Sequence, residues 1–271
     1  MKTLLLTTVL TFAAGAALAG GHACYEGKTL TEGKLTVATG NPAYYPWVMD
    51  DNPASGMGFE AAVAYAVAEE MGIAADDVTW VRTSFDEAIQ PGAKNFDVNM
   101  QQYSITAERE EMVDFSSPYY SAAMAVLAVG DATSTPAELS ALKELKWGAV
   151  GSTTAVPKLI ETIAPTSQPL LYGDNADVTA AMQAGQIDAA LFDLPTALFL
   201  SAVMIEGSKI IGQFPAASSE TPDQFGMLME EGSALKECVD AALASLTESG
   251  KLAEIEAQWL QDTTGVPLIA E

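Results

Sequence analysis

One arginine stands where it could hold an anion. Arg109 follows the segment 104–106 (Ser-Ile-Thr) and falls in the first turn of a predicted helix, 106–112. A cation at this helix end opposes the macrodipole, and basic residues are scarce, with Lys+Arg 12 against Asp+Glu 36. Because a guanidinium donates two parallel hydrogen bonds to a carboxylate, the pattern predicts a carboxylate site beside free helix N–H groups. The alternative is a solvated arginine paired with Glu110 or Glu111.

A turn later in the chain could supply further donors. The segment 151–154 (Gly-Ser-Thr-Thr) joins a predicted strand, 147–150, to a helix, so its backbone N–H groups could point at a small carboxylate. It lacks the lysine of a phosphate-binding loop. An ordinary helix cap explains the same residues equally well.

Catalytic chemistry finds little support. The single histidine, His22, lies in or beside a predicted signal peptide, so no Ser-His or Cys-His nucleophile is expected. The segment 56–61 matches G-x-G-x-x-A, but an acidic turn precedes it where a dinucleotide site needs a strand. We expect no catalytic residue, no cofactor and no metal site.

Two series of alternating strands and helices must position these residues. The first has strands at 35–39, 78–81 and 96–100 and an amphipathic helix at 59–71, and the second begins at residue 124. This alternation predicts an α/β protein with mostly parallel sheets covered on both faces. A ligand crevice is expected between two lobes, at the carboxyl ends of the strands.

The first residues are typical of a signal peptide. Lys2 precedes an apolar stretch, 4–18, which is too short to span a membrane comfortably, and 17–19 (Ala-Leu-Ala) fits the cleavage pattern. We expect a signal peptide at 1–23, cleaved after residue 19 or 23, and an exported protein. A buried N-terminal helix is the alternative.

Export bears on the two cysteines. An even number in an oxidising compartment favours a Cys24–Cys238 disulfide. A lipid anchor on Cys24 is less favoured, because Gly21 stands where a Leu-like residue normally precedes a lipidated cysteine. Free thiols are the third alternative.

Composition limits the partners. The chain has 271 residues, 49% of them hydrophobic, and a formal net charge of −24. The apolar content predicts one large or two modest folded domains. The acidity excludes nucleic acid and anionic lipid surfaces, because neutralising phosphates requires clusters of Lys and Arg.

Four motifs, in order, resemble periplasmic amino-acid-binding proteins of ABC importers (solute-binding protein family 3). They lie at 58–63, 104–119, 146–154 and 187–193, and the resemblance is co-linear over about 34–262. It implies the two-lobed periplasmic-binding-protein (type II) fold, in which each lobe is a mixed, mostly parallel sheet flanked by helices.

The resemblance also implies domain limits. Lobe 1 would comprise 28–123 plus 224–271, and lobe 2 would be 124–223. Two hinge crossings would join the lobes, which would close around a ligand by hinge motion.

Ligand contacts follow from the same resemblance. Arg109 would hold the ligand α-carboxylate and Asp193 the α-ammonium, although Asp193 suits a plain helix cap before Pro195 equally well. Tyr44 and Phe85 would wall the side-chain pocket unless they are simple core residues. Asn41 stands at the rim, where some binders of cationic amino acids show Asp, which argues against a strong preference for Lys or Arg. The other expected ligand-binding residues are donors and acceptors around the two charges: Ser104, Thr153, Thr154 and Gln102.

The function expected is transport. A monomeric, periplasmic protein would capture an amino acid or a related small carboxylate and deliver it to an ABC permease in the inner membrane. Two alternatives are an enzyme on the same scaffold, such as a dehydratase or lyase, and a ligand-sensing partner of a receptor.

Overall fold

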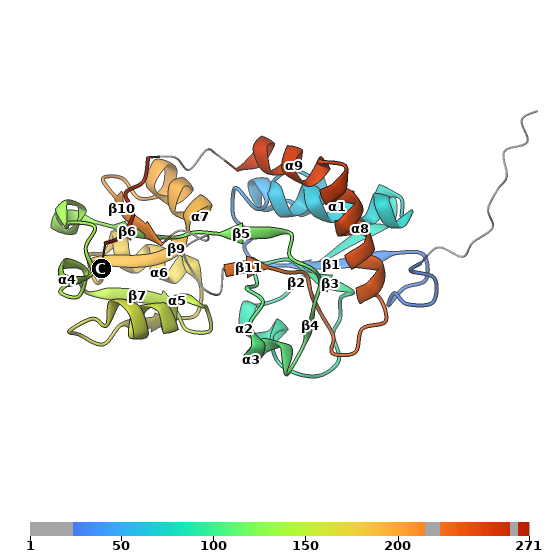
Figure 1. The fold of residues 1–271 in the computed structure, drawn as a ribbon, viewed down its shortest axis with the longest axis horizontal. Coiled ribbons are helices and arrows are strands. Elements are labelled where there is room, and N and C mark those ends of the chain that lie inside the picture. Colours follow the sequence, from blue (N-terminus) through green and yellow to red (C-terminus); the bar gives the residue numbers. More distant parts are fainter. Residues whose placement is uncertain (1–23, 215–222, 261–264, 271) are drawn as a thin grey trace, which may run out of the picture.

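The computed structural model describes residues 24–214, 223–260 and 265–270. The predicted signal peptide, 1–23, lies outside these residues. The described chain forms two α/β lobes side by side, connected by extended segments (Figure 1).

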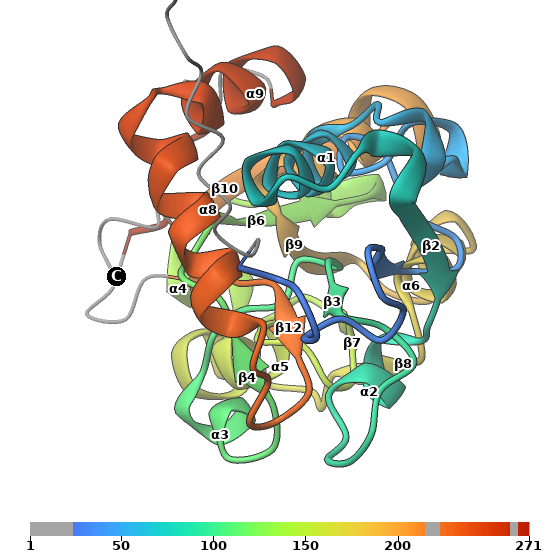
Figure 2. The same ribbon diagram turned by 90° about the vertical axis from the view of Figure 1, so that its right-hand side faces the viewer.

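The first lobe is built on a five-stranded sheet of order β2-β1-β3-β12-β4. One core cluster lies between this sheet and the helices α1, α8 and α9, and a second lies on the other face with α2 (Figure 2). The strands are β1 (Leu35–Thr39), β2 (Val78–Arg82), β3 (Val98–Asn99), β4 (Asp114–Phe115) and β12 (Leu228–Met229). The helices are α1 (Phe59–Met71), α2 (Phe85–Ala88), α3 (Ala107–Glu110), α8 (Lys236–Glu248) and α9 (Lys251–Trp259).

The second lobe repeats this plan with a sheet of order β10-β6-β9-β7-β8. Its two faces carry separate apolar clusters. The strands are β6 (Met124–Ala128), β7 (Trp147–Val150), β8 (Leu170–Tyr172), β9 (Ala189–Asp193) and β10 (Lys209–Phe214). The helices are α4 (Leu139–Leu142), α5 (Ala155–Pro157), α6 (Asn175–Gln183) and α7 (Leu194–Phe199).

Both sheets are mixed, as expected, but the parallel share is smaller than predicted. In each sheet, two of the four strand pairs among the described residues are parallel and two are antiparallel. The β-α alternation predicts parallel pairs only between strands that a helix connects. The antiparallel pairs instead involve β12 and β6, each of which enters its sheet after the chain has crossed between the lobes.

Two short strands form the crossings. β5 (Tyr120–Ala122) runs antiparallel to β11 (Asp223–Phe225), and the pair lies between the lobes (Figure 1). The proposed domain limits, near residues 123 and 224, fall at these two strands. Hinge motion would therefore bend segments that are already paired with each other.

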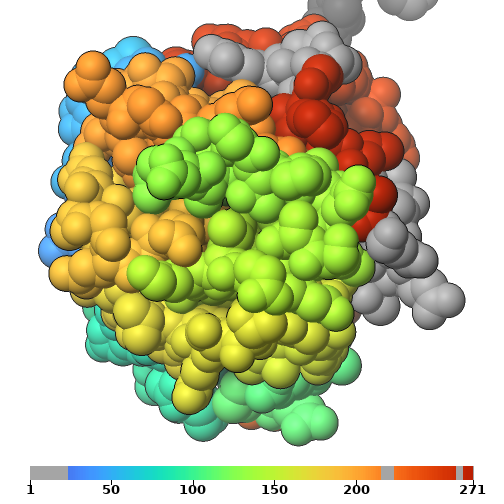
Figure 3. Space-filling view, turned by 90° about the vertical axis from the view of Figure 1, so that its left-hand side faces the viewer, coloured from blue at the N-terminus to red at the C-terminus, as the bar shows by residue number. Residues whose placement is uncertain are grey.

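The C-terminal residues lie on the second lobe, although we expected 224–271 in the first. Leu268 forms a bridge with Gln213 of β10, and Ala270 forms one with Glu138. The side chain of Ile269 packs into an apolar cluster of the second lobe. A Cβ on Gly212 would lie 2.7 Å from Ile269 Cγ1, so a larger residue there would displace the Ile269 side chain. Figure 3 shows the red C-terminal atoms beside the green and orange second lobe.

The predicted helix α1 is confirmed. Its start positions the loop that bears Trp47. Gly58 has φ 106°, and a Cβ there would lie 2.5 Å from the Trp47 carbonyl oxygen. The glycine therefore allows the loop bearing Trp47 to lie directly against the helix start. Gly72, with φ 85°, ends the helix in the left-handed conformation.

The cysteine prediction is also confirmed. Cys24 and Cys238 form a disulfide that ties the start of the described chain to α8. Cys238 is buried on α8, in the main apolar cluster of the first lobe.

Candidate functional site

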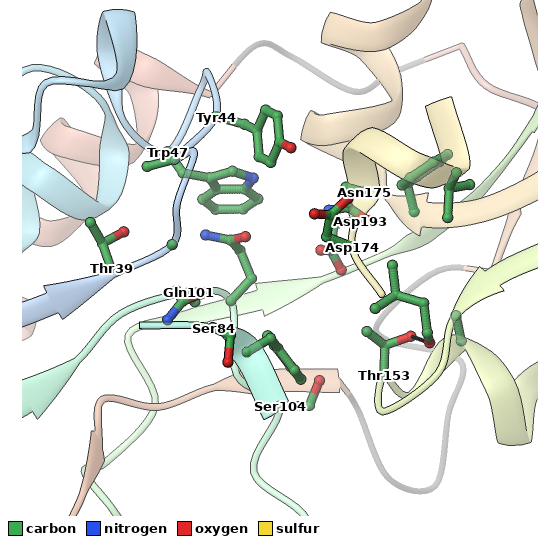
Figure 4. A pocket seen from close by; sticks show the side chains of 18 of the residues that line it. Thr39, Tyr44, Trp47, Ser84, Gln101, Ser104, Thr153, Asp174, Asn175 and Asp193 are labelled. Carbon is green, nitrogen blue, oxygen red and sulfur yellow. Dashed lines mark hydrogen bonds between the residues drawn. The ribbon is translucent and has the colours of Figure 1, made fainter. Parts of the chain in front are cut away.

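A cavity of about 200 Å³ lies between the lobes. Its lining comes from the loop after β1, from α1, from the segment that leads into α3, and from the β7, β8 and β9 ends of the second lobe. Figure 4 shows Tyr44, Trp47 and Gln101 on one side, facing Asp193, Asp174 and Asn175 on the other. All nine residues that the sequence analysis proposed for ligand binding line this one cavity: Asn41, Tyr44, Phe85, Gln102, Ser104, Arg109, Thr153, Thr154 and Asp193.

Arg109 is held rigidly at the cavity wall. Thr106 caps the short helix α3 by accepting a hydrogen bond from the Arg109 backbone N–H at 3.2 Å. The guanidinium donates from Nη1 to the Ser104 carbonyl oxygen at 2.7 Å and from Nη2 to the Ser152 carbonyl oxygen at 2.9 Å. Its Cζ also lies 5.4 Å from the centre of the Phe85 ring.

The charge of Arg109 has no close carboxylate partner. The residue is only 6% exposed, and no described carboxylate lies within 4.0 Å of its nitrogens. The expected alternative, a solvated arginine paired with Glu110 or Glu111, is therefore wrong. Burial lowers the pKa of Arg109, while the charge of Asp223 acts in the opposite direction. A buried guanidinium in this state is suited to an anionic ligand group.

Asp193 lies at the opposite side of the cavity. It ends β9 and precedes α7, which is the position of a helix cap, but its side chain forms no capping hydrogen bond. Burial raises the pKa of Asp193 well above the ordinary value, and the charges of Asp223 and Glu60 raise it further. A carboxylate crowded by other carboxylates in an enclosed space is stabilised by a cation.

The turn 151–154 faces Arg109 from the second lobe. Thr153 donates its hydroxyl to the Val150 carbonyl oxygen at 2.8 Å, within the turn itself. Thr154 does not cap α5 with its side chain. Its Oγ1 lies 3.4 Å from Ser104 Oγ of the first lobe and donates to Asp223 Oδ2 at 3.3 Å. The predicted donors therefore line the same cavity as Arg109, but their hydroxyls already have protein partners.

Aromatic side chains form the walls. Phe85 stacks on Tyr103 with ring centres 4.3 Å apart. The Tyr44 hydroxyl is buried and has no hydrogen-bond partner in the described part of the chain. Asn41 is exposed at the rim, as expected.

Sequence reasoning missed Glu60. It is 1% exposed at the start of α1 and accepts hydrogen bonds from Tyr119 Oη and from both the backbone and side-chain nitrogens of Gln102. Burial raises the pKa of Glu60 to about 7. The segment 58–63 was interpreted only as a helix start, and an acidic residue in a first turn is ordinary there. Long-range hydrogen bonds with Gln102 hold the Glu60 carboxylate at the cavity wall.

The site and the fold together define a class. Two α/β lobes that enclose a small cavity, with a buried cation and a carboxylate on its walls, make a two-lobed binding protein of the periplasmic type II class. Residues 35–262 match the bacterial extracellular solute-binding proteins, family 3, and the chain belongs to this family. Among the described residues, no helix is long and apolar enough to cross a membrane.

Named relatives agree with this assignment. The chain is 26% identical to the arginine-binding periplasmic protein of Mannheimia haemolytica, over 81% of this chain and 88% of that protein. It is 25% identical to the glutamine-binding protein of a Bacillus subtilis ABC transporter, over 78% of this chain and 76% of that one. Among solved structures, an ancestral arginine-binding protein bound to glutamine superimposes with a TM-score of 0.70 at 25% identity, covering 84% of this chain and 98% of that one.

Proposed function

We propose that the protein binds an amino acid between its lobes, outside the inner membrane, and delivers it to an ABC permease. Arg109 would hold the α-carboxylate, and Asp193 would hold the α-ammonium. Relatives named for binding arginine, glutamine and cystine support this assignment. The protein would act by binding alone, without changing its ligand.

One observation carries the proposal: a buried guanidinium without a close carboxylate and an uncapped aspartate line the same small cavity. An amino acid carries a carboxylate and an ammonium a few ångströms apart. Each ligand charge loses water in the cavity, so each needs a protein charge of opposite sign. Removing either protein charge leaves a buried ligand charge unpaired, which typically costs about 2–5 kcal/mol.

The remaining residues would complete the binding site. In the turn 151–154, the N–H groups of Gly151 and Thr153 donate to the carbonyl oxygens of Tyr172 and Val150. The N–H groups of Ser152 and Thr154 would therefore approach the carboxylate from the second lobe. Gln102, whose side-chain nitrogen is bound to Glu60, would offer its Oε1 as an acceptor. Tyr44 and Phe85 would contact the ligand side chain, and Asn41 would lie at the entrance.

A thermal-shift screen of the protein amino acids, each tested singly on the mature chain, tests this function. An amino acid at one hundred times its dissociation constant stabilises by about 2.7 kcal/mol. For a chain of this size we expect the unfolding midpoint to rise by roughly 5–10 °C. Titration calorimetry then measures the affinity of the amino acids that respond.

Two variants test the assigned charges. Arg109→Ala and Asp193→Asn should each abolish the shift, whereas Glu110→Gln, an exposed change on the same short helix as Arg109, should retain it. If no amino acid binds, the proposed function is wrong. If Arg109→Ala still binds as tightly as the wild type, the site assignment is wrong.

A further inference from the structure

Asp223 stands beside the proposed carboxylate site, although nothing in the sequence singled it out. It begins β11, one of the two crossing strands, and pairs in register with Ala122 of β5. The bridge between Ser104 and Phe225 brings this strand against the segment that carries Ser104. An acidic side chain is therefore fixed at the hinge, next to the hydroxyls expected to meet the ligand.

The hydrogen-bond directions around Asp223 show which groups can receive the hydroxyl protons of Thr154 and Ser104. Thr154 Oγ1 donates to Asp223 Oδ2, and Ser104 Oγ lies 3.4 Å from Thr154 Oγ1. A hydroxyl carries a single proton. Because Thr154 directs its proton to Asp223, it can only accept from Ser104. Ser104 has Thr154 and Asp223 itself as possible acceptors, so the Asp223 carboxylate draws the proton of Thr154 and competes for that of Ser104.

Asp223 also shares its electrostatic surroundings with the ligand site. Burial raises the pKa of Asp223, while the hydroxyls of Ser104 and Thr154 and the charges of Arg109 and Lys158 act in the opposite direction and favour its ionised form. On the other side, its charge repels that of Asp193. The second carboxylate oxygen, Oδ1, is buried and has no hydrogen-bond partner among the described residues. An anion placed in the cavity on Arg109 would be repelled by this carboxylate, because both negative charges act on the same guanidinium.

We propose that Asp223 is a tethered competitor of the ligand carboxylate: it takes the hydroxyl proton of Thr154, competes for that of Ser104 and takes part of the Arg109 charge, and a bound carboxylate must displace these interactions. This inference rests on the proposed function. It assigns to the hinge strand a residue that sets the affinity for carboxylate ligands. Asp223 would not oppose the binding of a ligand group that has the same size but no negative charge.

The test compares a free amino acid with its α-carboxamide, which keeps the size but lacks the charge. The amino acid is the one that binds the wild type most tightly among the protein amino acids. Both compounds are titrated calorimetrically into the wild type, Asp223→Asn and Asp223→Ala. Asp174→Asn is the matched control, because Asp174 caps α6, a role that Asn fulfils equally well, and its charge acts on Tyr44, whereas Arg109 does not feel it as it feels that of Asp223.

We expect both Asp223 variants to bind the free amino acid roughly tenfold more tightly than the wild type, the order that relief of one like-charge repulsion gives in a partly screened site. Binding of the α-carboxamide should not tighten, and Asp174→Asn should leave the preference for acid over amide unchanged. Circular dichroism establishes that each variant is folded.

Other outcomes overturn the inference. Unchanged or weaker binding of the free amino acid by folded Asp223 variants would show that Asp223 assists the ligand or ignores it. Equal tightening in Asp174→Asn would indicate a general effect of cavity charge. In both cases wild-type binding leaves the proposed function standing. If no amino acid binds the wild type or any variant, the proposed function fails and this inference fails with it.

Discussion

The indole Nε1 of Trp47 donates a hydrogen bond of 2.8 Å to Thr196 Oγ1, across the boundary between the lobes. Trp47 is held by aromatic contacts with Phe59 of α1 and with Tyr120 and Phe225 of the crossing strands β5 and β11. Thr196 belongs to α7 of the second lobe, and both side chains are buried. This contact exists only while the lobes are together, so it connects closure with the integrity of the cavity.

Replacing Thr196 by Val should weaken amino-acid binding. The variant keeps the shape but leaves the indole N–H buried without an acceptor in the closed arrangement, which costs about 1–3 kcal/mol, or roughly 5- to 150-fold in affinity. Thr179→Val is the control, because Thr179 is equally buried but donates within its own helix α6. Calorimetry that gives equal affinities for both variants would contradict a role of Thr196 in closure.

Binding should release protons through Asp193. Its pKa is raised in the free protein, mainly by burial and then by Asp223 and Glu60, and a ligand ammonium favours the ionised form. Affinity should therefore rise as pH rises through the raised pKa of this carboxyl and level off above it. Calorimetry in buffers of different ionisation enthalpy counts the protons. Because a bound carboxylate would act on Asp223 in the opposite sense, the measurement is cleanest in Asp223→Asn, and Asp193→Asn should lose the effect.

Glu60 should lower the stability of the ligand-free protein at neutral and alkaline pH. Its pKa is about 7 in the folded state against an ordinary 4.5, so the folded protein binds more protons between these values. Stability therefore falls as pH rises from 4.5 to 7 and stays low above, by up to about 3 kcal/mol for this group. Glu60→Gln should be more stable than the wild type in urea at pH ~8 and lose that advantage near pH ~4. An advantage that persists at the lower pH would point to packing instead of charge.

The disulfide should stabilise the fold without affecting the site. It closes a loop with a sequence separation of 214, for which the chain-entropy relation gives up to about 5 kcal/mol. Cys24→Ala, which leaves the buried Cys238 side chain in place, should lower the urea midpoint, while the amino-acid affinity of the folded variant stays the same. Wild type unfolded in reductant serves as the comparison and should behave like the variant. Equal midpoints with and without reductant would show that the bond contributes little.

The sequence by itself predicted those features that depend on neighbouring residues. Apolar residues at helical spacing and a following glycine predict α1, and Thr106 caps α3 at the start of the predicted helix 106–112. The segment that ends at Arg109 indicated a carboxylate site because it places an arginine in the first turn of a helix, a pattern that neighbouring residues alone define. The order of motifs indicated the two-lobed fold, which the family match confirms.

Only the tertiary structure decided which distant groups meet. β12 lies between β3 and β4, and the C-terminal residues pair with β10. Glu60 lines the cavity beside Gln102, and Asp223 accepts a hydrogen bond from the lining residue Thr154. None of these contacts leaves a local pattern in the sequence. An acidic residue at a helix start or on a short strand gives the same pattern whether it is buried or exposed to solvent. The charges of Glu60 and Asp223 act on Asp193, and that of Asp223 on Arg109, only because packing removes water from these groups and brings them close together. Local spacing determined the secondary structure and indicated Arg109 as a carboxylate-binding residue. Burial and long-range pairing determined the electrostatics of the site.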